Sequence, residues 1–219
     1  MARKATTPEA PAPKRRRADA DRSVAAILDA ALDALAADPE TSMVEIAGQA
    51  GVARATIYMH FPTRETLLDA VMEYAVGRVA EATRGAEPHR GEPAEALARV
   101  LRATWRQLAQ FHGLLAINTA RLSAEELHRR HLPVLDQLQP LIERGQKAGV
   151  VRSDLPTSWL LAVIRSIVHT ASHEIRGGRL PDSEAEDVLI STVLGAISGS
   201  GGRPCRRHRE NRAGEATSA

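Results

Sequence analysis

The sequence predicts an all-α protein. Apolar residues recur at steps of three and four along most of the chain, which is the spacing of one face of a helix. Beyond Pro93 every periodic signal is helical, and no β-hairpin signal occurs. Prolines, glycines and capping residues divide the chain into about nine helices, which we group into an N-terminal three-helix head and a larger helical body.

The composition fits a globular protein of one or two domains. The chain has 219 residues, of which 43% are hydrophobic, and this supplies enough apolar surface for a core. A net charge of +2 and a pI near 9.0 are too mild to indicate nucleic-acid binding. Cys205 is the only cysteine, so no intramolecular disulfide can form, and no apolar run approaches the roughly 20 residues that span a bilayer. We therefore expect a cytoplasmic protein without a membrane segment or a secretory signal.

Residues 1–20 are predicted to form a disordered basic arm, because they are rich in Pro, Ala, Thr and basic residues and have little apolar surface to bury. Four consecutive basic residues lie near its end: Lys14, Arg15, Arg16 and Arg17. Such runs are most often solvated tails, but a flexible cationic arm beside a docked helix can also reach DNA. The motif that follows favours DNA contact.

The first helix is predicted from about Asp21 to Asp38, where Pro39 ends it. Its apolar stripe consists of Val24, Ile27, Leu28, Ala31, Leu32 and Leu35. Ser42 and Glu45 then have the spacing of a capping box, so a short second helix begins there. Gly51 marks the turn after it, since a residue without a Cβ reverses the chain there at no cost in backbone strain.

A short third helix follows and has two different faces. Ile57 and Phe61 form its buried stripe. The outward face carries Arg54, Ala55, Tyr58 and Met59. Two short helices across a glycine turn have the spacing of a helix-turn-helix, whose second helix enters the major groove of DNA. This outward face is therefore the predicted DNA-binding surface.

Residues 50–68, AGVARATIYMHFPTRETLL, resemble the DNA-binding domain of the TetR-like (tetracycline repressor) family of bacterial transcriptional regulators. The matching residues are Ala50, Gly51, Val52, Arg54, Ala55, Thr56, Ile57, Tyr58, His60, Phe61, Glu65 and Leu67. The chain departs from the family pattern at Ala53, where a capping Ser is usual, and at Arg64, where Lys is usual.

The resemblance implies roles for the matched residues. Arg54 is the better candidate for reading bases, and Ala55 and Met59 share its surface. The residues that resemble the family's phosphate-positioning set are Thr56, Tyr58, His60 and Arg64. The family also implies a homodimer that binds a double-stranded, palindromic operator and responds to a small-molecule effector.

The remaining helices build the predicted body. Pro62 and the candidate cap Thr63 open a connecting helix, which ends before a linker from Gly85 to Pro93. Ser123 and Glu126 form a second capping box that starts a short helix. Longer helices are predicted over about 93–115, 132–147 (with Pro140 in its middle), 156–177 and 183–198. We assign residues 21–74 to the DNA-binding domain, 75–199 to an effector-binding and dimerisation domain, and 200–219 to a disordered tail.

An effector site is predicted between the helices that follow Pro93, contain Pro140 and begin at Pro156. The candidate residues are Trp105, Leu108, Phe111, His112, Asn118, Leu138 and Ile164. Each of them could equally be an ordinary core residue. Because aromatic side chains are few and aliphatic ones many, we expect a largely apolar effector with one or two polar groups.

The last two helices are more apolar than one buried face requires, so they are the predicted dimer interface. The residues behind this prediction are Leu161, Ile167, Ala171, Val188, Leu189 and Ala196.

Metal binding and catalysis have little support. His169 and His173 lie four apart and could hold a metal ion, but no third ligand has a telling spacing, so we interpret them as surface or interface histidines. No nucleophile motif or phosphate-binding loop is present, and we predict no enzyme, metal or cofactor. The sequence thus favours a homodimeric, effector-released repressor; the alternative is a DNA-associated or adaptor protein without an effector.

Overall fold

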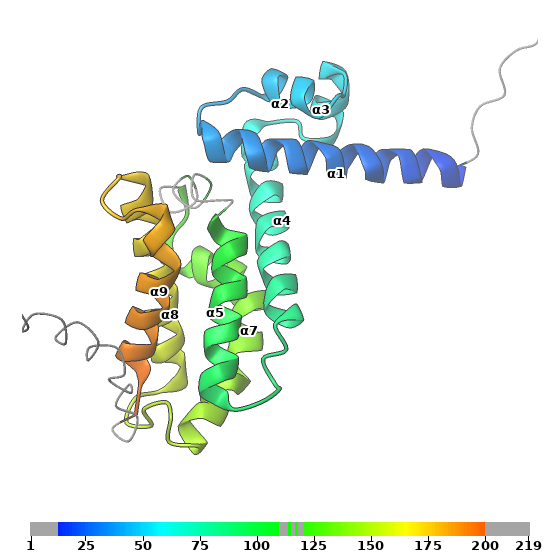
Figure 1. The fold of residues 1–219 in the computed structure, drawn as a ribbon. Coiled ribbons are helices and arrows are strands. Elements are labelled where there is room, and N and C mark those ends of the chain that lie inside the picture. The colour runs from blue at the N-terminus through cyan, green and yellow to red at the C-terminus, as the bar shows by residue number, and fades with distance from the viewer. Residues whose placement is uncertain (1–12, 110–113, 115–116, 118–120, 200–219) are drawn as a thin grey trace, which may run out of the picture. The chain divides into compact units, whose positions relative to one another are not determined.

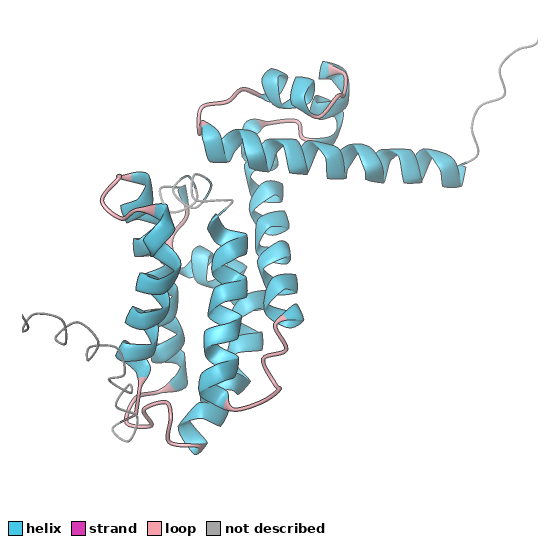
Figure 2. Ribbon diagram, viewed as in Figure 1, coloured by secondary structure: helices cyan, strands magenta, loops and turns pink. Residues whose placement is uncertain are grey.

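The structure is a computed structural model that describes residues 13–109, 114, 117 and 121–199. These residues form α-helices and no β-sheet, so the all-α prediction is confirmed (Figures 1 and 2). The helices are α1 (Pro13–Ala37), α2 (Met43–Gln49), α3 (Arg54–His60), α4 (Arg64–Gly85), α5 (Pro93–Ala109), α7 (Ala124–Lys147), α8 (Thr157–Arg176) and α9 (Asp182–Ile197). No helix in this described part of the chain is long and apolar enough to cross a membrane.

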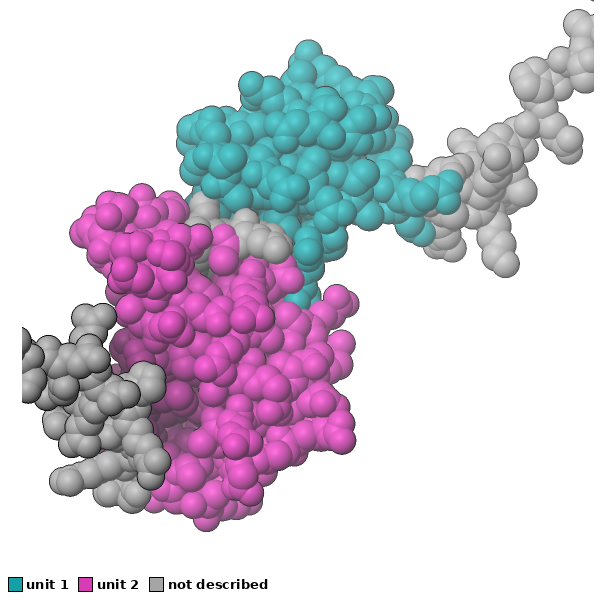
Figure 3. All heavy atoms as spheres, in the orientation of Figure 1, with its two compact units in different colours: residues 1–78, 110–130 teal, residues 79–109, 131–219 magenta. Residues whose placement is uncertain are grey.

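The chain divides into two compact units, coloured separately in Figure 3. The head unit comprises residues 1–78 and 110–130, and the body unit comprises residues 79–109 and 131–219. Helices α4 and α7 each contribute to both units. Residues 110–130 were expected to belong to the body, whereas their described part belongs to the head unit.

The core of the head unit forms where four helices meet. Ile27 of α1, Ile46 of α2, Ile57 of α3 and Val71 of α4 are all fully buried in one cluster. Burying such a side chain stabilises the fold by about 1.5–3 kcal/mol. Leu114, from the described part of residues 110–130, joins the same cluster. The apolar stripe predicted for the first helix therefore packs in the same core as the buried residues of α2 and α3.

Helix α1 begins at Pro13, so the predicted start at Asp21 is wrong, and residues 13–20 of the predicted arm are helical instead of disordered. Proline suits the first position of a helix because its missing N–H would be unpaired there. Lys, Arg and Ala, which dominate the next turns, are strong helix formers. Lys14, Arg15, Arg16 and Arg17 accordingly lie on the first turns of α1, and residues 1–12 of the predicted arm lie outside the described residues.

In the body unit α9 packs against both α5 and α8, and the second part of α7 contributes buried residues to the core. Buried side chains on each helix supply the contacts, among them Leu97, Leu101, Ile142, Leu160 and Leu189. One polar pair is buried with them: the hydroxyl groups of Thr83 and Thr104 lie 3.2 Å apart, and Thr83 also donates to the carbonyl of Val79.

A single helix, α7, replaces the two helices predicted over residues 123–147. Ser123 caps it as predicted, because the amide of Glu126 donates to the Ser123 hydroxyl at 3.2 Å. Pro133 and Pro140 both lie inside it. Each proline leaves the carbonyl four residues earlier without a helical donor, but the prolines and those earlier residues are exposed, so water can bond the carbonyls. The helix therefore continues through both.

The linker between α4 and α5 is held by two arginines. Arg99 donates to the carbonyls of Ala86, Glu87 and Arg90, while Arg144 donates to those of Pro88, His89 and Gly91. Every carbonyl from residue 86 to residue 91 thus accepts a hydrogen bond from a charged donor, the stronger kind of hydrogen bond. The end of α4 is fixed within the body unit by these bonds.

Candidate nucleic-acid interface

The turn between α2 and α3 has the geometry predicted from its sequence. The Glu45 amide donates to the Ser42 hydroxyl at 3.3 Å, and the Ser42 amide donates to the Glu45 carboxylate at 2.8 Å. The Ser42 backbone amide, followed by the Ser42 hydroxyl, lowers the pKa of the Glu45 carboxyl. Gly51 follows with a φ of 66°, a left-handed conformation that favours glycine. The capping box and the glycine turn are confirmed.

Helix α3 buries one side and exposes the other. Ile57 is fully buried and Phe61, which caps the end of the helix, is nearly so. On the outer side, Arg54, Tyr58 and Met59 are exposed, and Met59 keeps 69% of its surface accessible. The Arg54 guanidinium lies over the Tyr58 ring, 5.7 Å from its centroid, a cation–π arrangement that orients both groups. The two-faced helix predicted from the sequence is therefore present; we call its outer side the α3 outer face.

Two residues of the predicted phosphate set lie just beyond this face. His60 is half-buried, and its Nε2 atom has no hydrogen-bond partner among the described residues. Arg64 uses both terminal nitrogens inside the head unit: it donates to the carbonyl of Pro39 at 2.5 Å and to that of Thr41. Arg64 thus ties the start of α4 to the loop before α2, a role that the sequence did not reveal. A phosphate contact by either residue stays a prediction.

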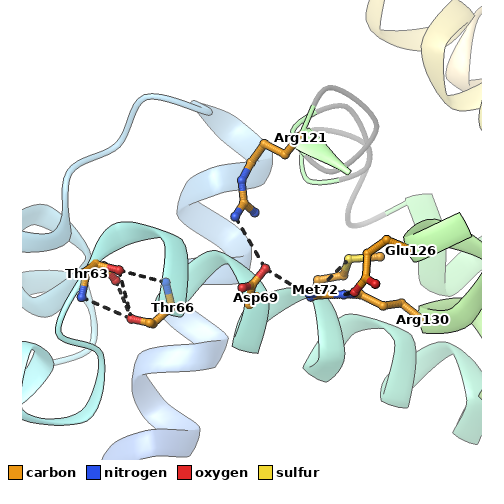
Figure 4. A network of polar contacts seen from close by, with 7 residues as sticks. All are labelled: Thr63, Thr66, Asp69, Met72, Arg121, Glu126 and Arg130. Carbon is orange, nitrogen blue, oxygen red and sulfur yellow. Dashed lines mark hydrogen bonds and ion pairs between the residues drawn. The ribbon is translucent and has the colours of Figure 1, made fainter. Parts of the chain in front are cut away.

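The start of α4 is capped by a threonine pair, shown in Figure 4. The Thr66 amide donates to the Thr63 hydroxyl and the Thr63 amide to the Thr66 hydroxyl, both at 3.2 Å. The pKa of the neighbouring Glu65 carboxyl is lowered, mainly by a hydrogen bond from its own backbone and by the Thr63 hydroxyl, with smaller contributions from Arg121 and Arg64. Thr63 is therefore the helix cap that the sequence predicted.

Ala53 occupies the cap position of α3 in an extended conformation and provides no side-chain hydrogen bond. Ala53→Ser is therefore expected to stabilise the protein by about 1 kcal/mol, because the hydroxyl can accept from an unpaired amide of the first turn. Denaturant unfolding measures the change. Ala55→Ser is the matched control: inside the helix the same substitution should be slightly destabilising. Equal changes in the free energy of unfolding at both positions would show that the missing cap does not limit the stability of α3.

The predicted effector residues that the structure describes lie in the body unit. Trp105 on α5, Leu138 on α7 and Ile164 on α8 are buried, and Leu108 on α5 is half-buried. Phe111, His112 and Asn118 lie outside the described residues. Sequence reasoning missed Thr83 as the hydrogen-bond partner of Thr104, next to Trp105. A threonine within an apolar stripe was the available signal, but it does not identify its partner on another helix.

The residues predicted for the dimer interface differ in their exposure, and Ile167 on α8 is half-buried. Leu161, Ala171 and Leu189 are buried within the body unit itself. Val188 and Ala196 on α9 are exposed, as is Trp159 on α8, which keeps 57% of its surface accessible. Large exposed apolar side chains of this kind are enriched at protein interfaces. The exposure of Trp159 excludes a core position for it in the body unit.

The histidine pair predicted within one helix is replaced by a pair between two helices. The rings of His169 on α8 and His131 on α7 have centroids 5.4 Å apart, while His173 is exposed. Burial, followed by the charges of His131 and Arg165, lowers the pKa of His169 to about 4. Among the described residues no group of three or more His, Cys, Asp or Glu side chains could hold a metal ion.

Two family models match the chain. One, described as bacterial regulatory proteins of the tetR family, matches residues 27–71, which include α2, α3 and the adjoining parts of α1 and α4. The other, described as the C-terminal domain of SbtR-like transcriptional regulators, matches residues 92–191.

Individual proteins are similar over most of the chain. The transcriptional repressor LfrR of Mycolicibacterium smegmatis is 26% identical over 177 residues, which cover 81% of this chain and 91% of LfrR. A crystal structure of a TetR transcription regulatory protein from Mycobacterium vanbaalenii is 31% identical, covers 84% of this chain and 99% of its own, and has a TM-score of 0.57.

Two ligand-bound structures share the fold. LfrR in complex with proflavine has a TM-score of 0.62 at 24% identity and covers 81% of this chain and 97% of its own. FadR from Bacillus subtilis, in complex with stearoyl-CoA, has a TM-score of 0.63 at 22% identity and covers 79% of this chain and 98% of its own.

Proposed function

Because the chain belongs to the TetR family of bacterial regulatory proteins, we propose that it is a homodimeric repressor that a small-molecule effector releases from a palindromic operator. The relatives are named transcriptional regulators, so the chain is a DNA-binding regulator of transcription and not an enzyme. We propose three further properties: a homodimeric state, a palindromic operator and release by a small-molecule effector.

The α3 outer face is the observation that carries the DNA-binding part. A buried Ile57 holds the helix, while Arg54, Tyr58 and Met59 remain accessible on its other side. We assign base reading to Arg54, since a guanidinium can bond guanine in the major groove through two donors. Thr56, Tyr58 and His60 are assigned to the phosphates, and Ala55 and Met59 to the surface between them. Arg64 already donates to the carbonyls of Pro39 and Thr41. We therefore assign it a phosphate contact only through the guanidinium N–H groups that these two bonds do not use.

The homodimer follows from what one helix can read. A single recognition helix covers about one half-site, so useful specificity requires two copies related by a two-fold axis. The exposed apolar residues of α8 and α9, among them Trp159, Val188 and Ala196, supply a surface for such a contact. Each copy would contribute two helices to a four-helix interface.

A footprint on the DNA around the protein's own gene tests the function. The purified full chain is expected to protect one palindromic segment, and only that segment should compete efficiently for binding as salt is raised. Protection that shows no sequence preference would favour the alternative, a DNA-associated or adaptor protein, over a repressor.

The effector is proposed to bind in the body unit near Trp105, Leu108, Leu138 and Ile164. Two relatives of the same fold are described with small-molecule ligands, proflavine and stearoyl-CoA, which supports a ligand here. The hydroxyl pair of Thr83 and Thr104 would meet the polar group of an otherwise apolar effector. Release from DNA requires that the effector bind the released state more tightly than the DNA-bound state.

Trp105 fluorescence tests this placement. Trp159→Phe removes the other tryptophan, which is exposed, so the remaining emission reports on Trp105 alone. With proflavine and stearoyl-CoA as first probes, any compound that releases the operator should also change Trp105 emission. Thr104→Val should weaken that release while leaving operator affinity without the compound nearly unchanged. Release with no change in Trp105 emission would place the site elsewhere.

A further inference from the structure

Asp69 lies on the second turn of α4 and faces two arginines from residues 121–130, as Figure 4 shows. Its Oδ1 atom is 3.2 Å from Arg130 Nη1 and 3.5 Å from Arg121 Nη2. Both arginines belong to the head unit, although they follow Asp69 by more than fifty residues in the sequence. One carboxylate of α4 is therefore held by two cations from a distant part of the chain.

The side chain of Arg130 is held in position by contacts other than the one with Asp69. Its Nε atom lies 2.5 Å from the carboxylate of Glu126, one turn earlier on α7, and its Nη1 atom lies 4.0 Å from the sulfur of Met72. The side chains of Arg130 and Glu126 are only 19% and 20% exposed. A partly buried and geometrically fixed pair of this kind is coupled more strongly than a surface ion pair, which loses its energy to side-chain entropy and to screening.

The same turns of α4 support the DNA-binding surface. Arg64 bonds the loop before α2, and Leu67, Leu68 and Val71 pack in the cluster that buries Ile57 of α3. An interaction that fixes the position of α4 at Asp69 therefore also fixes the α4 residues against which α3 packs. Neither Arg121 nor Arg130 belongs to α3, so their effect on DNA binding would be indirect.

We propose that Asp69, Arg121 and Arg130 are positioning residues for DNA binding, which form a clamp that holds the start of α4, and with it α3, in the orientation that binds the operator. This inference rests on the proposed function. The clamp attaches α4 to α7, a helix that continues unbroken from Arg130 to Lys147 and is shared by both units. Without the clamp, α3 has to be ordered when DNA binds, and that entropy cost lowers affinity.

Operator titrations with Asp69→Asn, Arg130→Gln and the double variant test the clamp. Each single variant is expected to weaken operator binding by about 2- to 30-fold, the range for residues that couple to a site without touching the ligand. The double variant should be little weaker than Asp69→Asn alone, because Asp69→Asn already removes the ion pair that Arg130→Gln breaks. Affinity for nonspecific DNA should stay unchanged, since a loosened head still carries its cations.

Arg129→Gln is the matched control. Arg129 neighbours Arg130 and also pairs with Glu126, but its side chain is 66% exposed, and the ion pairs of Asp69 among the described residues are with Arg121 and Arg130. The Arg129→Gln substitution removes the same charge as Arg130→Gln and should leave operator affinity unchanged. Arg130→Lys keeps the charge and should recover most of the affinity. Arg121→Gln is a second variant of the clamp, useful if Arg130→Gln folds poorly.

The salt dependence separates positioning from direct contact. A positioning role leaves the slope of log affinity against log salt unchanged, whereas a lost phosphate contact lowers it by about 0.9. A reduced slope in Arg130→Gln, or unchanged affinity of all clamp variants for an operator that the wild type binds, would overturn the inference. If the wild type itself shows no sequence preference, the proposed function fails, and the inference fails with it.

Discussion

Ala196→Arg is expected to convert the protein to monomers and to reduce its operator affinity to the level of nonspecific binding. Ala196 is exposed on α9, in the surface that we propose for the dimer contact. In a two-fold interface each substitution occurs twice, so two long charged side chains would have to lose their water. Specific binding is typically about 10³- to 10⁷-fold tighter than nonspecific binding, and the loss should lie in that range. Light scattering measures the mass, and operator titration measures the affinity.

Ala148→Arg is the control for this prediction, because it makes the same substitution at an exposed alanine just after α7. That variant should remain a dimer with normal affinity. Val188→Arg, at a second exposed position of α9, should behave like Ala196→Arg. Ala171 is unsuitable since it is buried in the body unit, where arginine would destabilise the fold itself. Dimers that persist in both α9 variants would show that copies of the chain associate through another surface.

Replacing Lys14, Arg15, Arg16 and Arg17 together by alanine should weaken binding to every DNA sequence and flatten its salt dependence. Each phosphate contact that is lost removes about 0.9 from the log–log slope, so four contacts would remove about 3.6. Alanine is the strongest helix former, so the first turns of α1 should persist. Titrations between about 50 and 200 mM salt measure the slope.

Operator and nonspecific DNA should be affected in parallel by the four substitutions, because phosphate contacts carry no sequence information. Circular dichroism serves as the check that α1 is retained. A slope identical to that of the wild type would show that the basic residues only solubilise the chain.

The helix-turn-helix could be predicted residue by residue because its signals are local. Ser42 and Glu45 lie three residues apart and bond each other. Gly51 makes the turn because glycine adopts the positive φ that the turn requires. Ile57 and Phe61 share one face of α3 because of helical geometry alone. In each case the sequence contains both partners of the interaction within a few residues.

Element lengths and distant contacts could not be predicted in the same way. Helix α1 starts earlier than expected because Lys, Arg and Ala are strong helix formers even within a charged run. Helix α7 continues through two prolines because water can bond the carbonyls that they leave unpaired. Arg130 and Asp69 are 61 residues apart, and no sequence pattern connects them. The effector and dimer residues depend on tertiary packing too: Ala171 and Trp159 look alike as apolar residues of one helix, yet one is buried and the other exposed.

The operator affinity of Arg54→Ala, with Tyr58→Ala beside it, most directly tests the claim that α3 reads DNA. Both side chains are exposed on the α3 outer face, so the thermal unfolding midpoint should barely change. At one fixed salt concentration, Arg54→Ala should lose about 1–3 kcal/mol of discrimination between the operator and an altered site. Tyr58→Ala should also weaken operator binding, since it removes the proposed phosphate contact and the ring beneath Arg54. Operator affinity equal to that of the wild type in both variants would contradict the assignment of DNA reading to α3.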